Sequence, residues 1–331
     1  MIRAVVIAMA AAALACAAAA APAPRAAHAD PPDVVLLTGD CASGNFLCSE
    51  FVRAVKRTGA HARIVSPDPR EDIVGTLSLL AREGHDLVMV DFRYTDDLAI
   101  VAPRFPAVRF GVVDAPLATV GSAPNVAAVV TRPNEASYLA GWLAARLERR
   151  RRGPDVVGVV GGEPIPPVED FVLGFRAGAQ AASPGVGVLT GYTNDFTDPT
   201  KCAAVARRQI ARGAGAVFDV AGGCGPGTLA AAKAAGVWAI GVDEDRSSLG
   251  PYILTSVVKR YDREMALLIR GVANGRLRFG RTTVLGLARG GTELGRISAR
   301  VPAPVLAGLA AVRRRIVSGR IHVPGIRIPP P

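Results

Sequence analysis

Short apolar runs alternate with longer stretches of mixed polarity along most of the chain. Continuous runs of this kind are typical of strands buried on both faces of a parallel sheet. The runs lie at 34–37, 62–65, 87–90, 110–113 and 126–130, and again at 156–160, 186–189, 216–220 and 237–242. The intervening stretches predict helices, the clearest at 136–149, 168–182, 200–212 and 227–235. This alternation predicts an α/β protein with two doubly wound parallel-sheet units.

The last part of the chain has a different pattern. A helix is predicted at 257–270, and a hairpin at 282–297, where glycines accompany alternating apolar residues. A final helix is predicted at 305–318, with Gly319 as its stop. The proline-rich end, 324–331, is predicted to lie as an irregular tail against the surface.

The first 29 residues have the pattern of a secretory signal. Arg3 precedes an uncharged run at 4–21, and a small-x-small site ends at Ala29. The run is mostly alanine and only weakly apolar, so we expect cleavage after Ala29 and export rather than a transmembrane anchor. Lipid anchoring at Cys16 stays open, although Ala13 stands where a bacterial lipoprotein signal usually has leucine.

The formal charge of +11 does not by itself indicate a nucleic-acid-binding protein. The arginines are scattered, and the one cluster, 149–152, follows a predicted helix with few aromatic residues near it. A stacking platform for single strands is therefore missing, and we expect no nucleic-acid partner. After removal of the signal, about 300 residues remain, enough for two domains.

Four cysteines remain in the mature chain, and an even count in an exported protein permits two disulfides. Cys41 and Cys48 flank the loop after the first apolar run, whereas Cys202 and Cys224 follow neighbouring runs of the second series. We therefore predict the pairs Cys41–Cys48 and Cys202–Cys224. A zinc site is not expected, because the chain has no Cys-x-x-Cys motif with a histidine nearby.

Polar and aromatic residues gather where the predicted strands end, which is where open α/β sheets bind ligands. In the first half these residues are Asp40, Asn45, Phe46, Asp91, Phe92 and Asp96. In the second half they are Phe196, Gly222, Gly223, Asp243, Asp245 and Lys259. Carboxylates and amides bind hydroxyls and amines, phenylalanines cover a flat ring, and glycines let backbone N–H groups approach closely. The set suits a neutral polar ligand with a planar ring.

Structural roles are the alternative for several of these residues. Asp40 and Asp198 have the position of helix caps. Lys259 can pair with a surface acid, and Gly222-Gly223 can be a tight turn.

The usual signatures of catalysis are missing from the sequence. No Gly-Lys-Ser/Thr follows the glycines, no Gly-x-Ser-x-Gly elbow is present, and Gly39 stands alone after the first apolar run. We therefore expect a binding protein without cofactor or metal, not an enzyme. A nucleoside hydrolase that uses carboxylates alone remains an alternative.

Several ordered motifs resemble the basic membrane protein family of ABC-transporter solute-binding proteins, whose purine-nucleoside receptors are the best-known branch. They are NVAAVVTRPNEASYLAGWLAA from Asn125, VGVVGGEPIPPVEDFVLGFRAGAQ from Val157, GYTNDFTDP from Gly191, AGGCGPG from Ala221, AIGVDEDR from Ala239, LTSVVKRYD from Leu254 and IVSGRIHVP from Ile316. The resemblance covers nearly the whole mature chain.

The resemblance implies a type I periplasmic-binding-protein fold, with the ligand between two lobes joined by three crossings. The crossings would follow Val130 and lie near Pro251 and Phe279. The first lobe would comprise 30–130 and 252–279, the second 131–251 and 280–318, with 1–29 as signal and 319–331 as tail.

The resemblance also assigns roles to site residues. Asp243 and Asp245 would bind sugar hydroxyls together with Lys259. Phe196 would face the ring, Asp96 would contact polar ring atoms, and Asn45 would line the first lobe.

Two positions depart from the family pattern. Ser43-Gly44-Asn45-Phe46 replaces the usual Ser-Phe-Asn, which moves the aromatic by two places. Asp91 stands where the family usually has glycine, and an added carboxylate would favour a ligand that bears an amine.

The sequence therefore predicts an exported receptor that binds a nucleoside-like ligand by hinge closure. Its partners would be an ABC permease and ATPase, it would be monomeric, and it would meet the membrane only through the permease or a lipid anchor. The alternative within the same fold is a ligand-sensing partner of a membrane signalling receptor.

Overall fold

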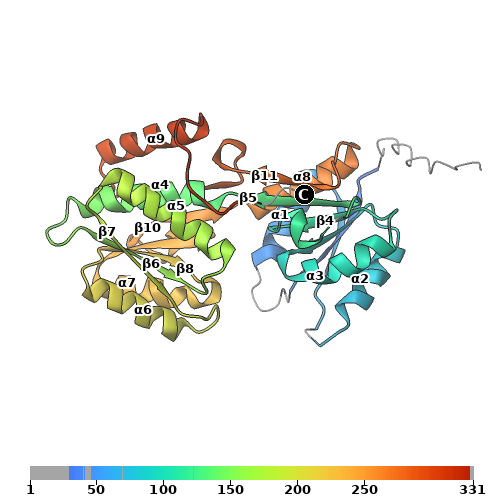
Figure 1. Ribbon diagram of the computed structural model, residues 1–331, viewed down its shortest axis with the longest axis horizontal. Helices are drawn as coiled ribbons and strands as arrows, with labels where there is room; N and C mark the ends of the chain where they lie inside the picture. The colour runs from blue at the N-terminus through green and yellow to red at the C-terminus, as the bar shows by residue number, and fades with distance from the viewer. Residues whose placement is uncertain (1–29, 40, 42–45, 69, 122, 329–331) are drawn as a thin grey trace, which may run out of the picture.

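The computed structural model describes residues 30–328 except 40, 42–45, 69 and 122, so the expected signal and Cys16 lie outside the described residues. Figure 1 shows two α/β lobes side by side, with the connecting segments gathered along one side of the molecule. Each lobe is built on one sheet with helices on both faces. No helix within the described ranges is long and apolar enough to cross a membrane.

Lobe 1 contains a six-stranded sheet of order β11-β5-β4-β3-β1-β2, in which every pairing is parallel. Its strands are β1 (Asp33–Leu37), β2 (His61–Val65), β3 (Leu87–Asp91), β4 (Phe110–Val113), β5 (Val126–Thr131) and β11 (Arg281–Leu285). One face packs against α1 (Phe46–Thr58) and α8 (Tyr261–Ala273), the other against α2 (Ile73–Arg82) and α3 (Thr95–Val101). The inner strands β1, β3, β4 and β5 are almost wholly buried, because helices cover both faces, whereas the edge strands β2 and β11 are partly exposed.

Lobe 2 repeats this plan with the order β12-β10-β9-β8-β6-β7. Its strands are β6 (Val156–Gly161), β7 (Gly187–Tyr192), β8 (Ala216–Val220), β9 (Trp238–Asp243), β10 (Ile253–Lys259) and β12 (Thr292–Leu294), the last antiparallel to β10. On one face lie α4 (Pro133–Glu148), α5 (Pro166–Ala182) and α9 (Ala303–Val317). On the other lie α6 (Pro199–Ala211) and α7 (Pro226–Ala235).

The strand pairing corrects two of the expected crossings. The chain leaves the first sheet after Thr131, but β10 still pairs with β9, so the second change of sheet comes at Arg260 and not near Pro251. The third comes after Leu285 and not near Phe279, because β11 pairs with β5. The expected lobe boundaries at 252 and 279 therefore cut off one strand from each sheet. The apolar run 253–258 adds a strand that the periodicity did not separate from the following helix.

The strand pairing also corrects two predicted elements near the end of the chain. The segment 257–270 divides into the end of β10 and the helix α8. The segment 282–297 is not a hairpin, because β11 and β12 belong to different sheets. Alternating apolar residues are typical of strands but do not determine which strand each one pairs with.

The C-terminal segment lies against lobe 2. Asn134 Nδ2 donates to the backbone oxygens of Val323 and Pro324, at 3.4 and 3.1 Å. The Ile326 backbone N–H donates to Asp170 at 2.7 Å. These bonds, with Ile321 and Val323 packed against the core, hold the described part of the predicted tail in place.

Candidate ligand-binding site

The carboxyl ends of the two sheets face the junction of the lobes. At the end of β5 the chain passes through Arg132 into α4 of lobe 2, and at the end of β10 it passes through Arg260 into α8 of lobe 1. Each sheet therefore directs the ends of its parallel strands toward the other lobe. This is the edge at which doubly wound sheets bind ligands.

Two aspartates occupy matching places at these edges. Asp114 directly follows β4 and Asp243 ends β9, and these strands are third in their respective sheet orders. Both aspartates have left-handed backbones, with φ of 64° and 63°. This conformation is uncommon for residues other than glycine, and aspartate is one of the few that tolerate it. The repeated geometry stops both strands abruptly at the junction.

Asp114 connects the strand ends of the two lobes. Its carboxylate accepts a hydrogen bond from the Lys259 ammonium at 2.5 Å and one from the Tyr261 hydroxyl at 2.9 Å. Its backbone N–H donates to Glu264 at 3.0 Å. The Lys259 ammonium also lies 4.9 Å from the centroid of the Tyr261 ring. Lys259 ends a strand of lobe 2, so this ion pair bridges the sheets beside the second crossing.

Burial and charge set the protonation of this cluster. Burial lowers the pKa of Lys259, but the carboxylates of Asp114, Asp243 and Glu264 outweigh it, so the pKa is raised and the ammonium stays charged. Burial, with the nearby Asp114 charge, raises the pKa of Glu264 well above its usual value. Glu264 Oε1 has no hydrogen-bond partner within the described part of the chain. Glu264 therefore holds a proton more tightly than an exposed glutamate does.

Asp243 is the carboxylate of the cluster that remains available. Burial raises its pKa to about 6, and the Lys259 charge opposes the rise. The side chain is only half-buried, and no group among the described residues donates a hydrogen bond to it. Above its pKa it is an ionised acceptor beside a buried ammonium, which is an arrangement that binds a ligand hydroxyl.

The wall contributed by lobe 2 brings Phe196 together with three glycines. A Cβ on Gly162 would lie 2.3 Å from the Phe196 ring, so the ring can lie there only because Gly162 has no side chain. A Cβ on Gly222 would lie 3.7 Å from the same ring, and one on Gly223 would lie 3.0 Å from the Phe196 backbone oxygen. Gly222 has a φ of 54°. The glycines therefore position the ring as well as exposing their backbone.

In lobe 1, the carboxylate of Asp91 is already paired. Asp91 is fully buried and accepts hydrogen bonds from Thr38 Oγ1 at 2.5 Å and from Arg93 Nη2 and Nε at 2.7 and 3.0 Å. The bidentate guanidinium neutralises its charge. The expectation that Asp91 favours an amine-bearing ligand therefore loses its basis, because the sequence argument did not consider Arg93.

The remaining predicted residues differ in their surroundings. Phe92 is 47% exposed beside Arg93, and Asp96 is exposed in the first turn of α3. The Phe46 ring contacts the edge of the Tyr261 ring, with 5.2 Å between centroids. Asp245 accepts from the backbone N–H groups of Ser247 and Arg296, which points to a role in the loop. Asp40 and Asn45 lie outside the described residues.

A family model described as ABC transporter substrate-binding protein PnrA-like matches residues 48–327 of this chain. The chain belongs to the Bmp family. The match confirms the resemblance found in the sequence motifs, and it makes the chain an ABC transporter substrate-binding protein by family.

Relatives and solved structures agree with this placement. The CD4+ T-cell-stimulating antigen of Listeria monocytogenes is 28% identical over 271 residues, covering 76% of this chain and 74% of the relative. The ABC transporter nucleoside-binding protein BmpA of Lactococcus lactis is 27% identical, covering 73% and 72%.

A solute-binding protein structure from Conexibacter woesei has a TM-score of 0.71 at 27% identity, covering 89% of this chain and 99% of that one. Another, from Aeropyrum pernix, has a TM-score of 0.75 at 24% identity, with 89% and 94% covered, and supports the fold alone. The predicted type I periplasmic-binding-protein fold is thereby confirmed.

Both predicted disulfides are present in this Bmp-family chain. Cys41–Cys48 and Cys202–Cys224 are bonded, with Cα atoms 5.8 and 5.7 Å apart. The first connects the segment after β1 to α1, and the second connects α6 to the turn after β8. Each therefore stiffens a segment beside the junction.

Three residues of this Bmp-family site were missed from the sequence: Asp114, Tyr261 and Glu264. Asp114 directly follows the fourth apolar run, and collecting a residue from every strand end would have included it. Tyr261 lies in the LTSVVKRYD motif. Glu264 gives no sequence signal, because an acid in the first turn of a helix usually faces solvent.

Proposed function

We propose that this protein captures a small polar ligand, nucleoside-like in chemistry, between its two lobes and presents it to the permease of an ABC importer. One observation supports the proposal above the others. The half-buried Asp243 carboxylate lacks a partner among the described residues and lies in the electrostatic field of the buried Lys259. The name of the Lactococcus lactis relative supports the ligand class.

Each wall has a role in this proposal. Asp243 and Lys259 bind the sugar hydroxyls, and Phe196 covers one face of the ring. The backbone of Gly222 and Gly223 lies close to the ligand, while Asp96 approaches from lobe 1. Neutral hydroxyls suit this site because Asp114 already balances the Lys259 charge.

Closure of the lobes completes the site. The chain changes sheet three times at one side of the molecule, which is the arrangement of a hinge (Figure 1). Closing the hinge brings the Phe92 and Asp96 wall toward the Phe196 wall, and it excludes water from the ligand.

Calorimetry tests the ligand and the site together. Inosine, adenosine, guanosine and uridine are titrated into the mature protein, with ribose and adenine as partial ligands. Asp243→Ala leaves ligand donors unpaired, so we expect a loss of about 1–3 kcal/mol, or roughly 5- to 150-fold in affinity.

Asp68→Ala is the matched control, because it removes the same charge from an exposed loop residue. Unchanged affinity in Asp243→Ala would remove that residue from the site. If no nucleoside binds but another polar solute does, the ligand class is wrong and the receptor function stands.

Export and assembly belong to the same proposal. Mass spectrometry of the protein secreted by its native host should show a mature chain beginning at Asp30. A lipid-modified chain beginning at Cys16 would establish an anchor instead. Size-exclusion chromatography with light scattering should give the mass of a monomer.

A further inference from the structure

A groove rich in arginine lies on lobe 1, outside the junction of the lobes. It has a volume of about 600 Å³, within the range of small-molecule sites. Its floor and walls come from α8, the edge strand β11 and the segment that joins them, with Arg57 from the end of α1 and Arg289 from the turn after β11. Six of the lining residues are arginines: Arg57, Arg263, Arg270, Arg276, Arg278 and Arg289. No acidic residue is among the described residues that line it.

The helix α8 places its lining residues on a single stripe. Arg263, Leu267, Arg270 and Asn274 follow one another at spacings of three or four, so they share one face of the helix. Between them Gly271 has no side chain, and a Cβ there would lie 3.0 Å from the Leu277 side chain. The stripe therefore has positive side chains above an apolar floor.

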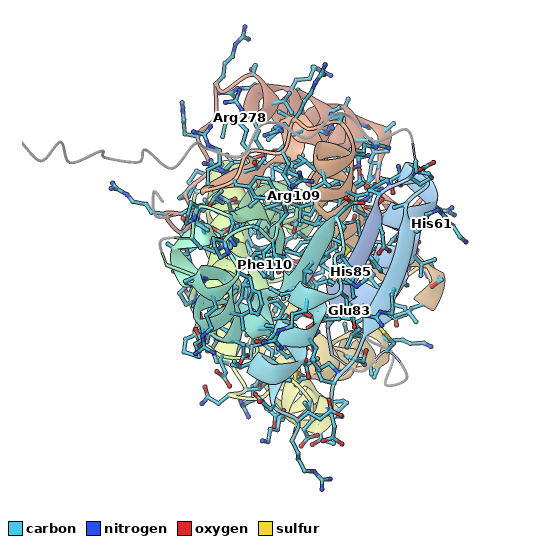
Figure 2. All side chains as sticks on the ribbon, turned by 90° about the vertical axis from the view of Figure 1, so that its right-hand side faces the viewer. His61, Glu83, His85, Arg109, Phe110 and Arg278 are labelled. Carbon is cyan, nitrogen blue, oxygen red and sulfur yellow. A yellow bond between two sulfur atoms is a disulfide. The ribbon has the colours of Figure 1, made fainter. Side chains whose placement is uncertain are left out.

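The groove runs along the length of the helix. Arg263 lies near the crossing at the start of α8, whereas Arg276 and Arg278 lie in the segment after its end. Figure 2 shows Arg278 near the top of the outer end of lobe 1, which is the side facing away from lobe 2. A 13-residue helix is about 20 Å long, so the charges are spread over a distance that suits an elongated ligand.

Most of this charge is not neutralised by the protein. Arg263, Arg270 and Arg289 donate to the backbone oxygens of Gly290, Arg57 and Val284, which orients each guanidinium without cancelling its charge. Arg276 and Arg278 have no carboxylate partner in the described part of the chain. Among the described residues that line the groove, only Arg57 forms an ion pair, with Asp262, whose charge also attracts Arg263. A concave site lined by one sign of charge concentrates ions of the opposite sign.

We propose that this groove binds an elongated, multiply charged phosphate, at a site independent of the ligand between the lobes. A guanidinium group binds phosphate oxygens through paired hydrogen bonds. Several arginines along the groove can therefore bind several phosphate groups of one ligand. The chemistry is shared by a free polyphosphate and by a phospholipid headgroup that carries two phosphates. The inference goes beyond the proposed receptor function and does not depend on it.

The test uses the mature protein with tripolyphosphate in calorimetry, and vesicles of phosphatidylcholine with and without cardiolipin in flotation. The groove variant is Arg276→Glu/Arg278→Glu, whose two side chains are exposed. The matched control is Arg207→Glu/Arg208→Glu on the exposed side of α6, with the same change of charge. Loss of charge-assisted bonds should weaken binding by about tenfold or more in the groove variant only.

The outcomes separate the two sources and can overturn the proposal. Binding of tripolyphosphate without flotation identifies a free phosphate, and flotation that tripolyphosphate inhibits identifies a headgroup. An equal loss in both variants would show an effect of overall charge and would refute a specific site. So would an absence of binding to either probe by the wild type. Arg276→Ala/Arg278→Ala checks that the loss does not require charge reversal, and circular dichroism checks folding.

Discussion

At the scale of single residues, the junction is governed by how each carboxylate is paired. Asp91 is fully buried and neutralised by Arg93, and Asp114 is shared between Lys259 and Tyr261. Asp243 has no such partner among the described residues. Asp91, which looked unusual in the sequence, is thus part of the scaffold. Asp114, which no sequence pattern singled out, lies at the centre of the hydrogen-bonded cluster between the lobes.

The pairing of Asp91 predicts a stability effect. Arg93→Ala leaves a buried carboxylate with only the Thr38 hydroxyl and a backbone N–H, so unfolding should cost about 1–3 kcal/mol less. Asp91→Asn/Arg93→Ala should recover much of the loss, because the amide carries no charge. Urea unfolding measures both. Equal losses in the single and double variants would show that the ion pair is not the cause.

Asp243 predicts a dependence on pH. Burial raises its pKa to about 6, so the folded protein holds the proton more tightly than the unfolded chain does. Ionising this carboxyl group therefore lowers the free energy of unfolding. The loss is absent below pH about 4 and fully present above pH about 6. Asp243→Asn should therefore stabilise the ligand-free protein at pH 7.5, by up to about 2 kcal/mol.

The same substitution should weaken ligand binding, since the amide is a poorer acceptor. Thermal unfolding of the wild type and of Asp243→Asn across this pH range checks the sign. A stability gap that widens as the pH falls would contradict it.

At the scale of elements, each of the two disulfides holds a segment that directly follows a strand, β1 for Cys41 and β8 for Cys224. The two bonds close loops of different length. The separations are 7 residues for Cys41–Cys48 and 22 for Cys202–Cys224. Longer loops lose more entropy in the unfolded chain when they are closed. The second bond should therefore contribute more to stability.

Removal of each pair tests this ordering. Cys202→Ala/Cys224→Ala should lower the free energy of unfolding by about 2–4 kcal/mol, and by about 1 kcal/mol more than Cys41→Ala/Cys48→Ala. Urea unfolding under oxidising conditions gives both values. The reverse order would mean that native packing around the sulfurs, and not loop length, dominates.

At the scale of the whole molecule, two similar lobes are joined by three chain crossings, and ion pairs made by Lys259 and Arg260 lie at the second of them. The Lys259–Asp114 pair lies at the second crossing, so it remains beside the hinge as the lobes rotate. A ligand that contacts both walls stabilises the closed form by its differential affinity for the two forms.

Small-angle X-ray scattering tests closure directly. Addition of the tightest-binding nucleoside should reduce the radius of gyration of the wild type. Asp243→Ala at the same ligand concentration should change less, because a smaller fraction is bound. A bound protein with an unchanged radius would show that the ligand binds without lobe closure.

The sequence alone determined the α/β class, the two-lobe plan, the disulfide pairs and the family. Buried strands need continuous apolar runs, and helices between them need mixed faces, so these features are local and visible in the pattern. The cysteine pairs followed because each pair flanks or follows neighbouring strand ends. Phe196, Gly222 and Gly223 were likewise predicted as site residues because they follow strand ends of the second half.

Only the tertiary structure decided where the chain changes lobes and how the charges are paired. The strand Ile253–Lys259 joins lobe 2 because it pairs with β9, and pairing is a long-range choice that periodicity does not encode. Lys259 meets Asp114 across 145 positions of sequence, and the pKa of Glu264 is raised only because the fold buries it beside that carboxylate. The protonation and partners of a charge depend on what the fold brings near it, which no single segment contains.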